Sequence, residues 1–236
     1  MIKLSNRLLA AAKMVTEGNI LADVGTDHGY VPIYLCEQKK IPHAIAMDIN
    51  EGPLERAKEH IKLYEMGEYI ETRLSDGVAA LKAGEADSIL IAGMGGGLMM
   101  HILKDGKDVC RQAKELILQP QSELQRFREF LLEEGYEIVS EDMVLEEEKY
   151  YPMMKVRYAG AGRAAKETDR LASIYGGLLL KQKHPVLKTY LLWEQALYRK
   201  IYGQLKKSRP TEKILQRIGE VEQTLKDNEA ALQFFD

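Results

Sequence analysis

Short apolar runs alternate with amphipathic stretches along the first 160 residues of the chain. The apolar runs predict β-strands and the amphipathic stretches predict helices, so the alternation indicates βαβ units with parallel strands. The run Ile89-Leu90-Ile91-Ala92 is apolar at every position, which is typical of a strand covered by helices on both faces. The predicted strands of this kind cover residues 20–24, 44–48, 70–74, 88–92 and 116–119.

Two further β-prone segments, residues 137–145 and 150–158, follow each other across a short acidic turn. Two strands joined by so short a connection pair antiparallel. We therefore expect seven strands, with an antiparallel hairpin closing an otherwise parallel sheet. The sequence predicts an α/β fold for this part of the chain.

The remainder of the chain is helical in pattern. Residues 159–165 are small and polar, as in a linker, and beyond Thr168 the apolar positions recur in steps of three and four. Pro210 divides this region, so we expect a helical hairpin packed as a short antiparallel coiled coil. Glu194 and Asn228 interrupt the two apolar stripes with polar side chains. The predicted domains are residues 1–162 and residues 163–236.

The composition is that of a soluble globular protein, with 45% hydrophobic and 29% charged residues. No apolar stretch approaches the roughly 20 residues that a membrane-spanning helix needs, and the N-terminus has no signal-peptide pattern. The two cysteines, Cys36 and Cys110, are far apart and have no metal-ligand spacing. These features favour a cytoplasmic protein with no membrane association and no metal site.

Charge is distributed unevenly, although the net charge is only −3. Residues 1–162 carry 19 Lys and Arg against 27 Asp and Glu, a net of −8, whereas residues 163–217 carry 13 against 4, a net of +9. Residues 218–236 return to a net of −4, with 1 basic and 5 acidic side chains. A basic segment in an otherwise acidic chain indicates an anionic partner, and a merely solvated helix surface is the alternative.

A glycine-containing turn follows the first predicted strand, in the sequence Asp23-Val24-Gly25-Thr26-Asp27-His28-Gly29-Tyr30. Such a turn between a strand and a helix is typical of nucleotide-binding sites, because small residues let the backbone approach the ligand and the helix N-terminus offers free N–H groups. The dinucleotide pattern G-x-G-x-x-G is absent, since position 27 is Asp. A carboxylate there would repel a pyrophosphate and attract a sulfonium or ammonium group. The turn therefore predicts a cationic cofactor.

Two more acids lie at the ends of the next two predicted strands. Asp48 lies 25 residues after Asp23, where a carboxylate can accept hydrogen bonds from both hydroxyls of a ribose. The pair Asp76-Gly77 follows the third predicted strand, which ends at Leu74. An Asp after a strand is often only the N-cap of the next helix. Three acids at three successive strand ends nevertheless favour one shared binding site.

The segment Gly93-Met94-Gly95-Gly96-Gly97 follows the fourth predicted strand. Four glycines in five residues predict an open floor over which a flat substrate can lie. A flexible turn between a strand and a helix is the alternative interpretation.

These motifs resemble those of class I S-adenosylmethionine-dependent methyltransferases, whose first motif holds the methionyl part of the cofactor. The Asn-Pro-Pro-Tyr motif of the members that methylate exocyclic adenine amines is absent, which favours a different acceptor atom. Within the class, the chain resembles the bacterial TrmK family over essentially its whole length. One departure is Pro152, where the family pattern predicts an acidic residue. Four segments carry the resemblance: Gly25-Thr26-Asp27-His28-Gly29-Tyr30-Val31-Pro32, Ala92-Gly93-Met94-Gly95-Gly96, Ile117-Leu118-Gln119-Pro120-Gln121 and Glu146-Glu147-Glu148-Lys149-Tyr150-Tyr151.

The resemblance implies a Rossmann-like domain, a C-terminal helical hairpin that contacts tRNA, and methylation of N1 of adenine 22 in tRNA. Asp27 is the first candidate catalytic residue and is equally suited to anchoring the methionyl amine. His28 and Tyr30 are further catalytic candidates. A packed or capping role is the alternative for His28, and for Tyr30, which is suited to stacking on the target base, the alternative is a core position. The cofactor-binding residues implied for S-adenosylmethionine are Asp23, Gly25, Thr26, Asp27, Asp48, Ile49, Asp76, Gly77, Gly93 and Met94.

The implied substrate contacts fall into two groups. Gly95, Gly96 and Tyr150 are expected at the acceptor pocket. Tyr150 is included because aromatic rings stack on bases. The other group tracks phosphates and consists of Lys3, Arg7, Arg199, Lys206 and Arg209.

Three other functions stay open at this point. The chain could be a class I methyltransferase that acts on another RNA, a protein or a small molecule, or a non-catalytic RNA-binding relative. A nicotinamide dehydrogenase is disfavoured because Asp27 replaces the phosphate-cradling glycine. No obligate protein partner and no bound metal are indicated.

Overall fold

The computed structural model describes residues 2–160 and 169–236. These residues form two compact units, Met1–Glu167 and Thr168–Asp236. The domain boundary expected between residues 162 and 163 lies outside the described residues.

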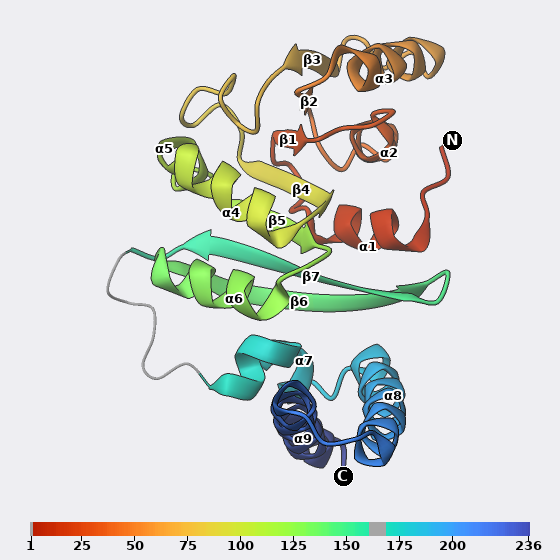
Figure 1. The fold of residues 1–236 in the computed structure, drawn as a ribbon. Coiled ribbons are helices and arrows are strands. Elements are labelled where there is room, and N and C mark those ends of the chain that lie inside the picture. The colour runs from red at the N-terminus through yellow and green to blue at the C-terminus, as the bar shows by residue number, and fades with distance from the viewer. Residues whose placement is uncertain (1, 161–168) are drawn as a thin grey trace. The chain divides into compact units, whose positions relative to one another are not determined.

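The first unit is built on a seven-stranded sheet with the order β3-β2-β1-β4-β5-β7-β6 (Figure 1). The first five strands pair in parallel, and β7 is antiparallel to both β5 and β6. The α/β fold and the closing hairpin predicted from the sequence are therefore confirmed. The strands are β1 (Leu21–Val24), β2 (Ala44–Asp48), β3 (Ile70–Leu74), β4 (Ser88–Met94), β5 (Glu115–Pro120), β6 (Tyr136–Glu146) and β7 (Lys149–Tyr158).

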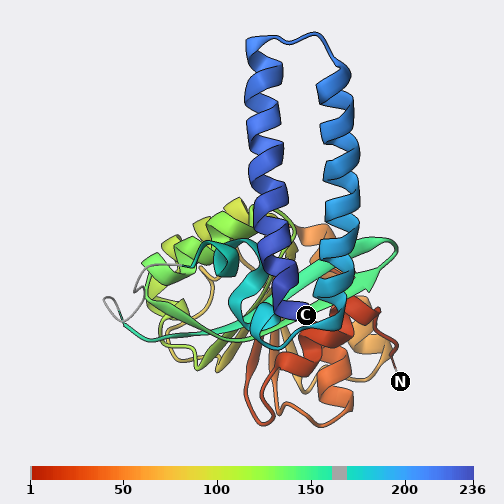
Figure 2. The same ribbon diagram turned by 90° about the horizontal axis from the view of Figure 1, so that it is seen from below.

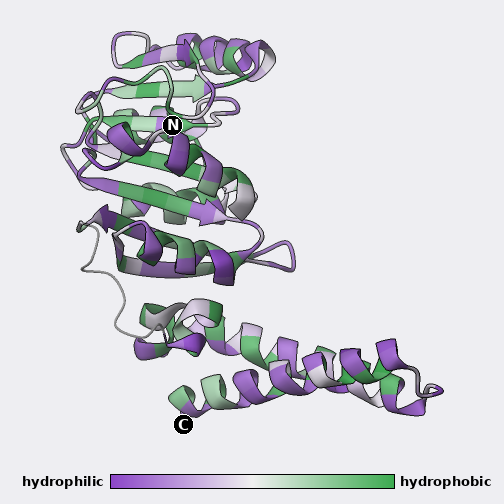
Figure 3. Cartoon of the chain, turned by 60° about the vertical axis from the view of Figure 1, so that its left-hand side comes forward, coloured by the Kyte–Doolittle hydropathy of each residue, from purple (hydrophilic) through white to green (hydrophobic). Residues whose placement is uncertain are grey.

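Helices cover both faces of this sheet. The helices α1 (Asn6–Met14), α2 (Tyr30–Glu37) and α3 (Glu51–Leu63) pack on one face. The helices α4 (Gly96–Asp105) and α6 (Leu124–Glu133), with the short α5 (Lys107–Cys110), lie on the other. Strands β1 and β5 are buried along their whole length, and Figure 3 shows the hydrophobic colouring of the central strands. Each fully buried aliphatic side chain contributes about 1.5–3 kcal/mol of transfer free energy.

The second unit is a helical hairpin preceded by a short helical segment (Figure 2). Helix α8 (Pro185–Lys207) starts with its proline in the first turn, and α9 (Glu212–Leu232) starts at Thr211, whose hydroxyl accepts a hydrogen bond from the Ile214 amide. Pro210 lies in the connection, as predicted. The remaining elements are η1 (Ala172–Gly176), α7 (Gly177–Lys181) and η2 (Gln233–Phe235).

The two polar interruptions of the hairpin meet in its interior. Glu194 of α8 is buried, and its carboxylate accepts hydrogen bonds from the Tyr175 hydroxyl at 2.7 Å, the Tyr190 hydroxyl at 2.8 Å and the Asn228 amide at 3.0 Å. The same Asn228 amide donates to the Leu191 carbonyl at 2.9 Å. Burial is the main cause that raises the pKa of Tyr175, so this hydroxyl stays a donor. A buried carboxylate is stable only with such partners, and the group ties η1, α8 and α9 together.

We expect Glu194→Ala to lower the free energy of unfolding of the helical unit by about 3 kcal/mol, because it leaves buried donors unsatisfied. Trp193, the one tryptophan of the chain, lies in α8, so urea unfolding followed by its fluorescence reports on this unit.

The matched control is Glu229→Ala, which removes an exposed ion pair with Arg199 at 3.4 Å. It is expected to change the unfolding free energy by less than about 1 kcal/mol. Equal effects of the two substitutions would show that the buried group does not hold the hairpin together.

Candidate functional site

The turn after β1 is fixed to the end of β2. Residues of the two strands pair in register up to Val24 and Met47. Beyond that pair, the amides of Gly25 and Thr26 both donate to the Met47 carbonyl at 2.8 Å. The β-sheet pairing therefore continues into the turn, and the carboxyl ends of β1 and β2 lie side by side.

Asp23 lies beneath this turn and is buried. Its carboxyl accepts a hydrogen bond from the Thr26 hydroxyl at 2.7 Å. The pKa of Asp23 is raised to about 6, mainly by burial; the hydrogen bond from Thr26 partly opposes this rise, and the nearby charge of Asp48 adds to it. Asp23 and Thr26, both expected to bind cofactor, thus bind each other and support the turn from inside.

The ends of β2 and β3 carry carboxylates beside exposed apolar side chains. One Asp48 oxygen, Oδ1, accepts a hydrogen bond from the Asn50 amide at 2.8 Å, and the Asp48 carbonyl accepts one from Ser75 at the end of β3. Ile49 and Leu74 are 57% and 55% exposed, although both are large and apolar. Apolar surface beside carboxylates can accept a flat ring that carries polar groups at its edge.

Two glycines at these strand ends have conformations or neighbours that exclude a side chain. Gly25 has a φ of +76°, and a Cβ there would overlap the terminal methyl of Met94. Gly77 has a φ of +55°, and a Cβ would lie 3.0 Å from the Ile102 side chain. Both positions therefore favour glycine, and the Met94 side chain lies against the turn after β1. Asp76, next to Gly77, is exposed.

Asp27 forms an ion pair with Arg56, a residue that was not among the candidates from the sequence. Its Oδ1 accepts a hydrogen bond from Nε of Arg56 in α3 at 3.0 Å. Arg56 Nη2 lies 2.8 Å from the same oxygen in an ion pair, and His28 Nε2 lies 3.4 Å away. The second oxygen, Oδ2, has no hydrogen-bond partner within residues 2–160 and 169–236. The Asp27 side chain is 56% exposed, so the pair contributes little to stability and the free oxygen faces solvent.

His28 and Tyr30 are part of a cluster of three stacked rings. His28 has a φ of +69° and Gly29 a φ of +66°, a left-handed conformation that costs energy for the histidine. The His28 ring stacks on Tyr30 and on His60 of α3, with centroids 5.0 Å and 5.1 Å apart. His60 Nδ1 lies 3.0 Å from the His28 carbonyl oxygen. The stack holds the turn in this conformation and places Asp27 at its tip.

The glycine segment after β4 is only partly open. The amide of Gly96 donates to the Ser122 hydroxyl at 3.2 Å, and that of Gly97 to Glu123 Oε2 at 2.8 Å. A Cβ on Gly96 would lie 2.5 Å from the Ser122 carbonyl oxygen. The predicted open floor is therefore wrong at these two positions, where glycine permits close packing against the start of α6.

Arg7, expected on tRNA phosphates, instead lies among the strand ends. Its Nη1 donates to Gln119 Oε1 at 3.0 Å, and its guanidinium lies 5.3 Å from the centre of the Tyr151 ring. Tyr150, the neighbouring ring, is half-buried on β7. Lys3 is exposed. Roles for Arg56 and His60 of α3 and for Gln119 of β5 were not predicted from the sequence, because the residues that they contact belong to other elements.

Part of the basic charge of the hairpin is balanced within the hairpin. Lys206 lies 3.9 Å from Glu222, and Arg199 forms the ion pair with Glu229 given above. Arg209, in the connection between α8 and α9, is exposed and has no ion pair with a described residue. The acidic C-terminal stretch thus faces the basic helix, a pairing that net charge by segment did not reveal.

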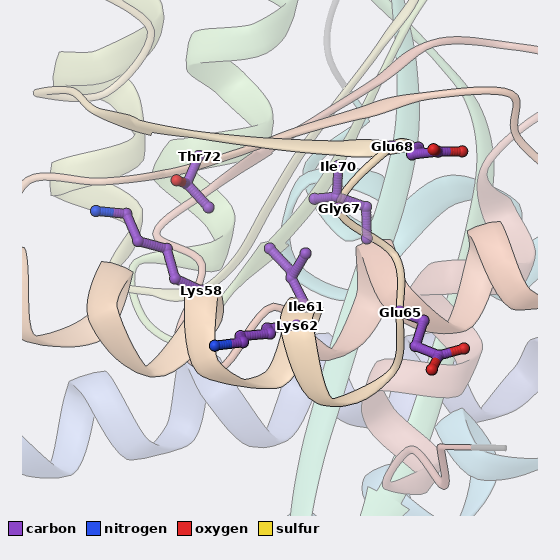
Figure 4. Close-up of a pocket in the computed structure, with 8 residues that line it drawn as sticks. All are labelled: Lys58, Ile61, Lys62, Glu65, Gly67, Glu68, Ile70 and Thr72. Atoms are coloured by element: carbon purple, nitrogen blue, oxygen red, sulfur yellow. The ribbon is translucent and has the colours of Figure 1, made fainter.

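A surface hollow beside α3 and β3 contains none of the candidate residues (Figure 4). Over the described part of the chain, no group of three His, Cys, Asp or Glu side chains is arranged to hold a metal ion. No described helix is long and apolar enough to cross a membrane. The residues that line the hollow are Lys58, Ile61, Lys62, Glu65, Gly67, Glu68, Ile70 and Thr72.

Comparison with known proteins places this geometry in a family. Residues 4–154 match a family model described as a methyltransferase domain. The chain is 36% identical over 222 residues to the tRNA (adenine(22)-N(1))-methyltransferase of Bacillus subtilis, covering 93% of each. The chain belongs to the TrmK family of methyltransferases. The crystal structure of the B. subtilis TrmK aligns with a TM-score of 0.84 and 32% identity, covering 98% of this chain and 100% of that one.

A TrmK relative from Streptococcus pneumoniae has been crystallised in complex with S-adenosyl-L-methionine. It aligns with a TM-score of 0.81 and 30% identity, over 98% of this chain and 100% of that chain. The match covers both units, so the helical hairpin is shared with this relative as well as the sheet. The family predicted from the four sequence segments is confirmed.

The raised pKa of Asp23 gives a test of the turn. Its folded value of about 6 lies above the ordinary value of 3.8, so the folded state holds a proton that the unfolded state releases between these values. The associated stability is present below pH 4 and is lost as the pH rises through 6. Asp23→Asn, which keeps an acceptor for Thr26, should therefore raise the free energy of unfolding at pH 8 by at most about 3 kcal/mol and change it little near pH 4.

Urea unfolding of the wild type and Asp23→Asn at pH 4.5, 6 and 8 measures this difference. A gain of the same size at every pH, or a loss at pH 8, would contradict the burial of an ionisable Asp23.

Proposed function

We propose that this chain transfers the methyl group of S-adenosylmethionine to N1 of adenine 22 in tRNA. The observation that carries the proposal is the convergence of Asp27, Asp48 and Asp76 at the carboxyl edge of one parallel sheet. Membership of the TrmK family supports the choice of cofactor and acceptor.

The residues at the strand ends fit the cofactor. Gly25, which has no side chain, lets a ligand approach the backbone of the turn. Asp48 keeps Oδ2 for the ribose hydroxyls, because only Oδ1 accepts the Asn50 amide within the described residues. The exposed side chains of Ile49 and Leu74 suit the faces of an adenine ring, with Asp76 and Gly77 at its edge. Gly93 and Met94 complete the site beside the turn.

The chemistry asked of the protein is mainly positioning. When bound, S-adenosylmethionine supplies an electrophilic methyl group on a sulfonium. N1 of neutral adenine has a lone pair and no proton, so its attack needs no general base, but the product is a cation. Asp27, with one oxygen facing solvent, stabilises that positive charge or anchors the methionyl amine. His28 and Tyr30 hold Asp27 in place through their stack with His60.

The tRNA is bound through charge and stacking. Lys3, Arg199, Lys206 and Arg209 contact phosphates, and Gly95, Gly96 and Tyr150 belong to the acceptor side of the site. Extrusion of the target base costs a few kcal/mol, which these contacts offset. The enzyme works in the cytoplasm, a reducing compartment in keeping with the free thiols of Cys36 and Cys110.

The proposal is tested with two tRNA transcripts that differ only in A22 or G22. With labelled cofactor, the A22 transcript should accept one methyl group, recovered as 1-methyladenosine after digestion, and the G22 transcript should accept none. Asp27→Asn should lower the rate on the A22 transcript by about 100-fold or more, as loss of a charge-stabilising group does. The matched control is Glu68→Gln in the hollow of Figure 4, which should leave the rate unchanged.

Equal methylation of both transcripts, or methylation of another nucleoside, would contradict the assignment of the acceptor. Transfer to a protein or small molecule without any transfer to RNA would identify a different member of the class, and absence of cofactor binding would identify a non-catalytic RNA-binding protein.

The contribution of Arg209 is measured by salt dependence. Arg209 has no ion-pair partner among the described residues. Its substitution by Ala should therefore weaken tRNA binding, and log affinity should fall less steeply with log salt, by roughly one unit of slope. Lys226→Ala, on the acidic helix α9, is the control and should leave the slope unchanged. An unchanged slope for Arg209→Ala would remove Arg209 from the tRNA-binding surface.

A further inference from the structure

Gln119 is a fully buried polar side chain at the end of β5. Its Oε1 accepts two hydrogen bonds, from Arg7 Nη1 at 3.0 Å and from the Gly93 amide at 3.0 Å. Its Nε2 lies 3.5 Å from the Pro120 carbonyl oxygen. One buried amide therefore joins α1, the end of β4 and the end of β5.

Gly93 is the residue at which β4 leaves its register with β5. Ala92 pairs with Gln119 and Met94 with Pro120, so Gly93 has no partner on β5 and forms a bulge. Its φ is +80°, in the region that favours glycine. A bulge re-aims the residues that follow it. The Gly93 amide, displaced from the ladder, takes the Gln119 side chain as its acceptor in place of a backbone carbonyl.

Arg7 fixes the orientation of that side chain. Its guanidinium lies over the Tyr151 ring of β7, and its Nη1 would lie 3.5 Å from a Cβ built on Gly93. The start of α1 is tied to the same hairpin, because the Asn6 amide donates to Glu146 Oε1 at 2.7 Å. The guanidinium of Arg7 therefore contacts two groups of the protein itself, the Tyr151 ring and the Gln119 side chain.

We propose that Arg7 and Gln119 are positioning residues for methyl transfer, which hold the Gly93 bulge and therefore Met94 in the conformation that the acceptor site needs. This proposal rests on the proposed function, which defines the reaction that Arg7 and Gln119 support. It replaces the sequence-based expectation that Arg7 contacts a tRNA phosphate. Arg7 acts through Gln119 and Gly93.

Kinetics separate a positioning role from a phosphate contact. In Arg7→Ala and Gln119→Leu, kcat for methylation of the tRNA should fall at least tenfold, while KM for tRNA and the salt dependence of binding stay within twofold of the wild type. Gln119→Glu keeps the acceptor for Arg7 and Gly93 and should retain most of kcat. Lys13→Ala, an exposed lysine on the same helix, is the control and should match the wild type. A raised KM with a smaller salt slope in Arg7→Ala would overturn the proposal in favour of a phosphate contact.

A second measurement requires neither tRNA nor methyl transfer. Hydrogen exchange of the free protein, read on a peptide that covers residues 89–95, reports on the Gly93 amide. Its exchange should be at least tenfold faster in Arg7→Ala and in Gln119→Leu, with the exchange of β1 unchanged as evidence of an intact fold. Unchanged exchange at Gly93 would overturn the proposal. If the exchange changes as expected but the wild type methylates no tRNA, the proposed function fails and the connection from Arg7 to Gly93 stands. Exchange in Arg7→Lys then shows whether a positive charge alone maintains that connection.

Discussion

The whole site depends on the parallel, in-register pairing of β1 with its two neighbours, β2 and β4. Parallel strands end at the same edge of a sheet, so this pairing brings together side chains that are far apart in the chain. Backbone hydrogen bonds extend it past the strand ends, from Gly25 and Thr26 to Met47 and from Ser75 to Asp48. The sheet therefore fixes the positions of the turns. Apolar residues buried on both of its faces stabilise the sheet.

Several features of this edge cost stability. Asp23 is buried with a raised pKa, and His28 takes a left-handed backbone conformation that a histidine rarely adopts. The surrounding structure compensates for both, through the Thr26 hydroxyl and through the stacking of Tyr30 and His60. Such local cost at a binding edge, supported by a well-packed sheet, is common in sites whose geometry has to exist before the ligand arrives. The Gly93 bulge, with its single side-chain acceptor, follows the same principle.

The sequence predicted the parts of the molecule that are encoded locally. Apolar runs such as residues 88–92 and the proline at 210 were enough to predict the strands and the helical hairpin, and Asp48 was chosen as a candidate because it is the last residue of a predicted strand. Features that depend on side chains from separate elements were not predictable in this way. Arg56 of α3 pairs with Asp27, which lies in the turn between β1 and α2. A glycine in the sequence does not show whether its backbone faces solvent or, as at Gly96, packs against another backbone segment.

We propose that carboxylates at the carboxyl edge of the sheet form the cofactor site. Calorimetric titration of the protein with S-adenosylmethionine tests it, comparing Asp48→Asn with Asp87→Asn, whose aspartate precedes β4 at the opposite edge and accepts the Ile20 amide. We expect Asp48→Asn to weaken binding by about tenfold or more, since a charged hydrogen bond to the ligand is lost, and Asp87→Asn to have no effect. Wild-type affinity in Asp48→Asn, or an equal loss in both variants, would contradict it.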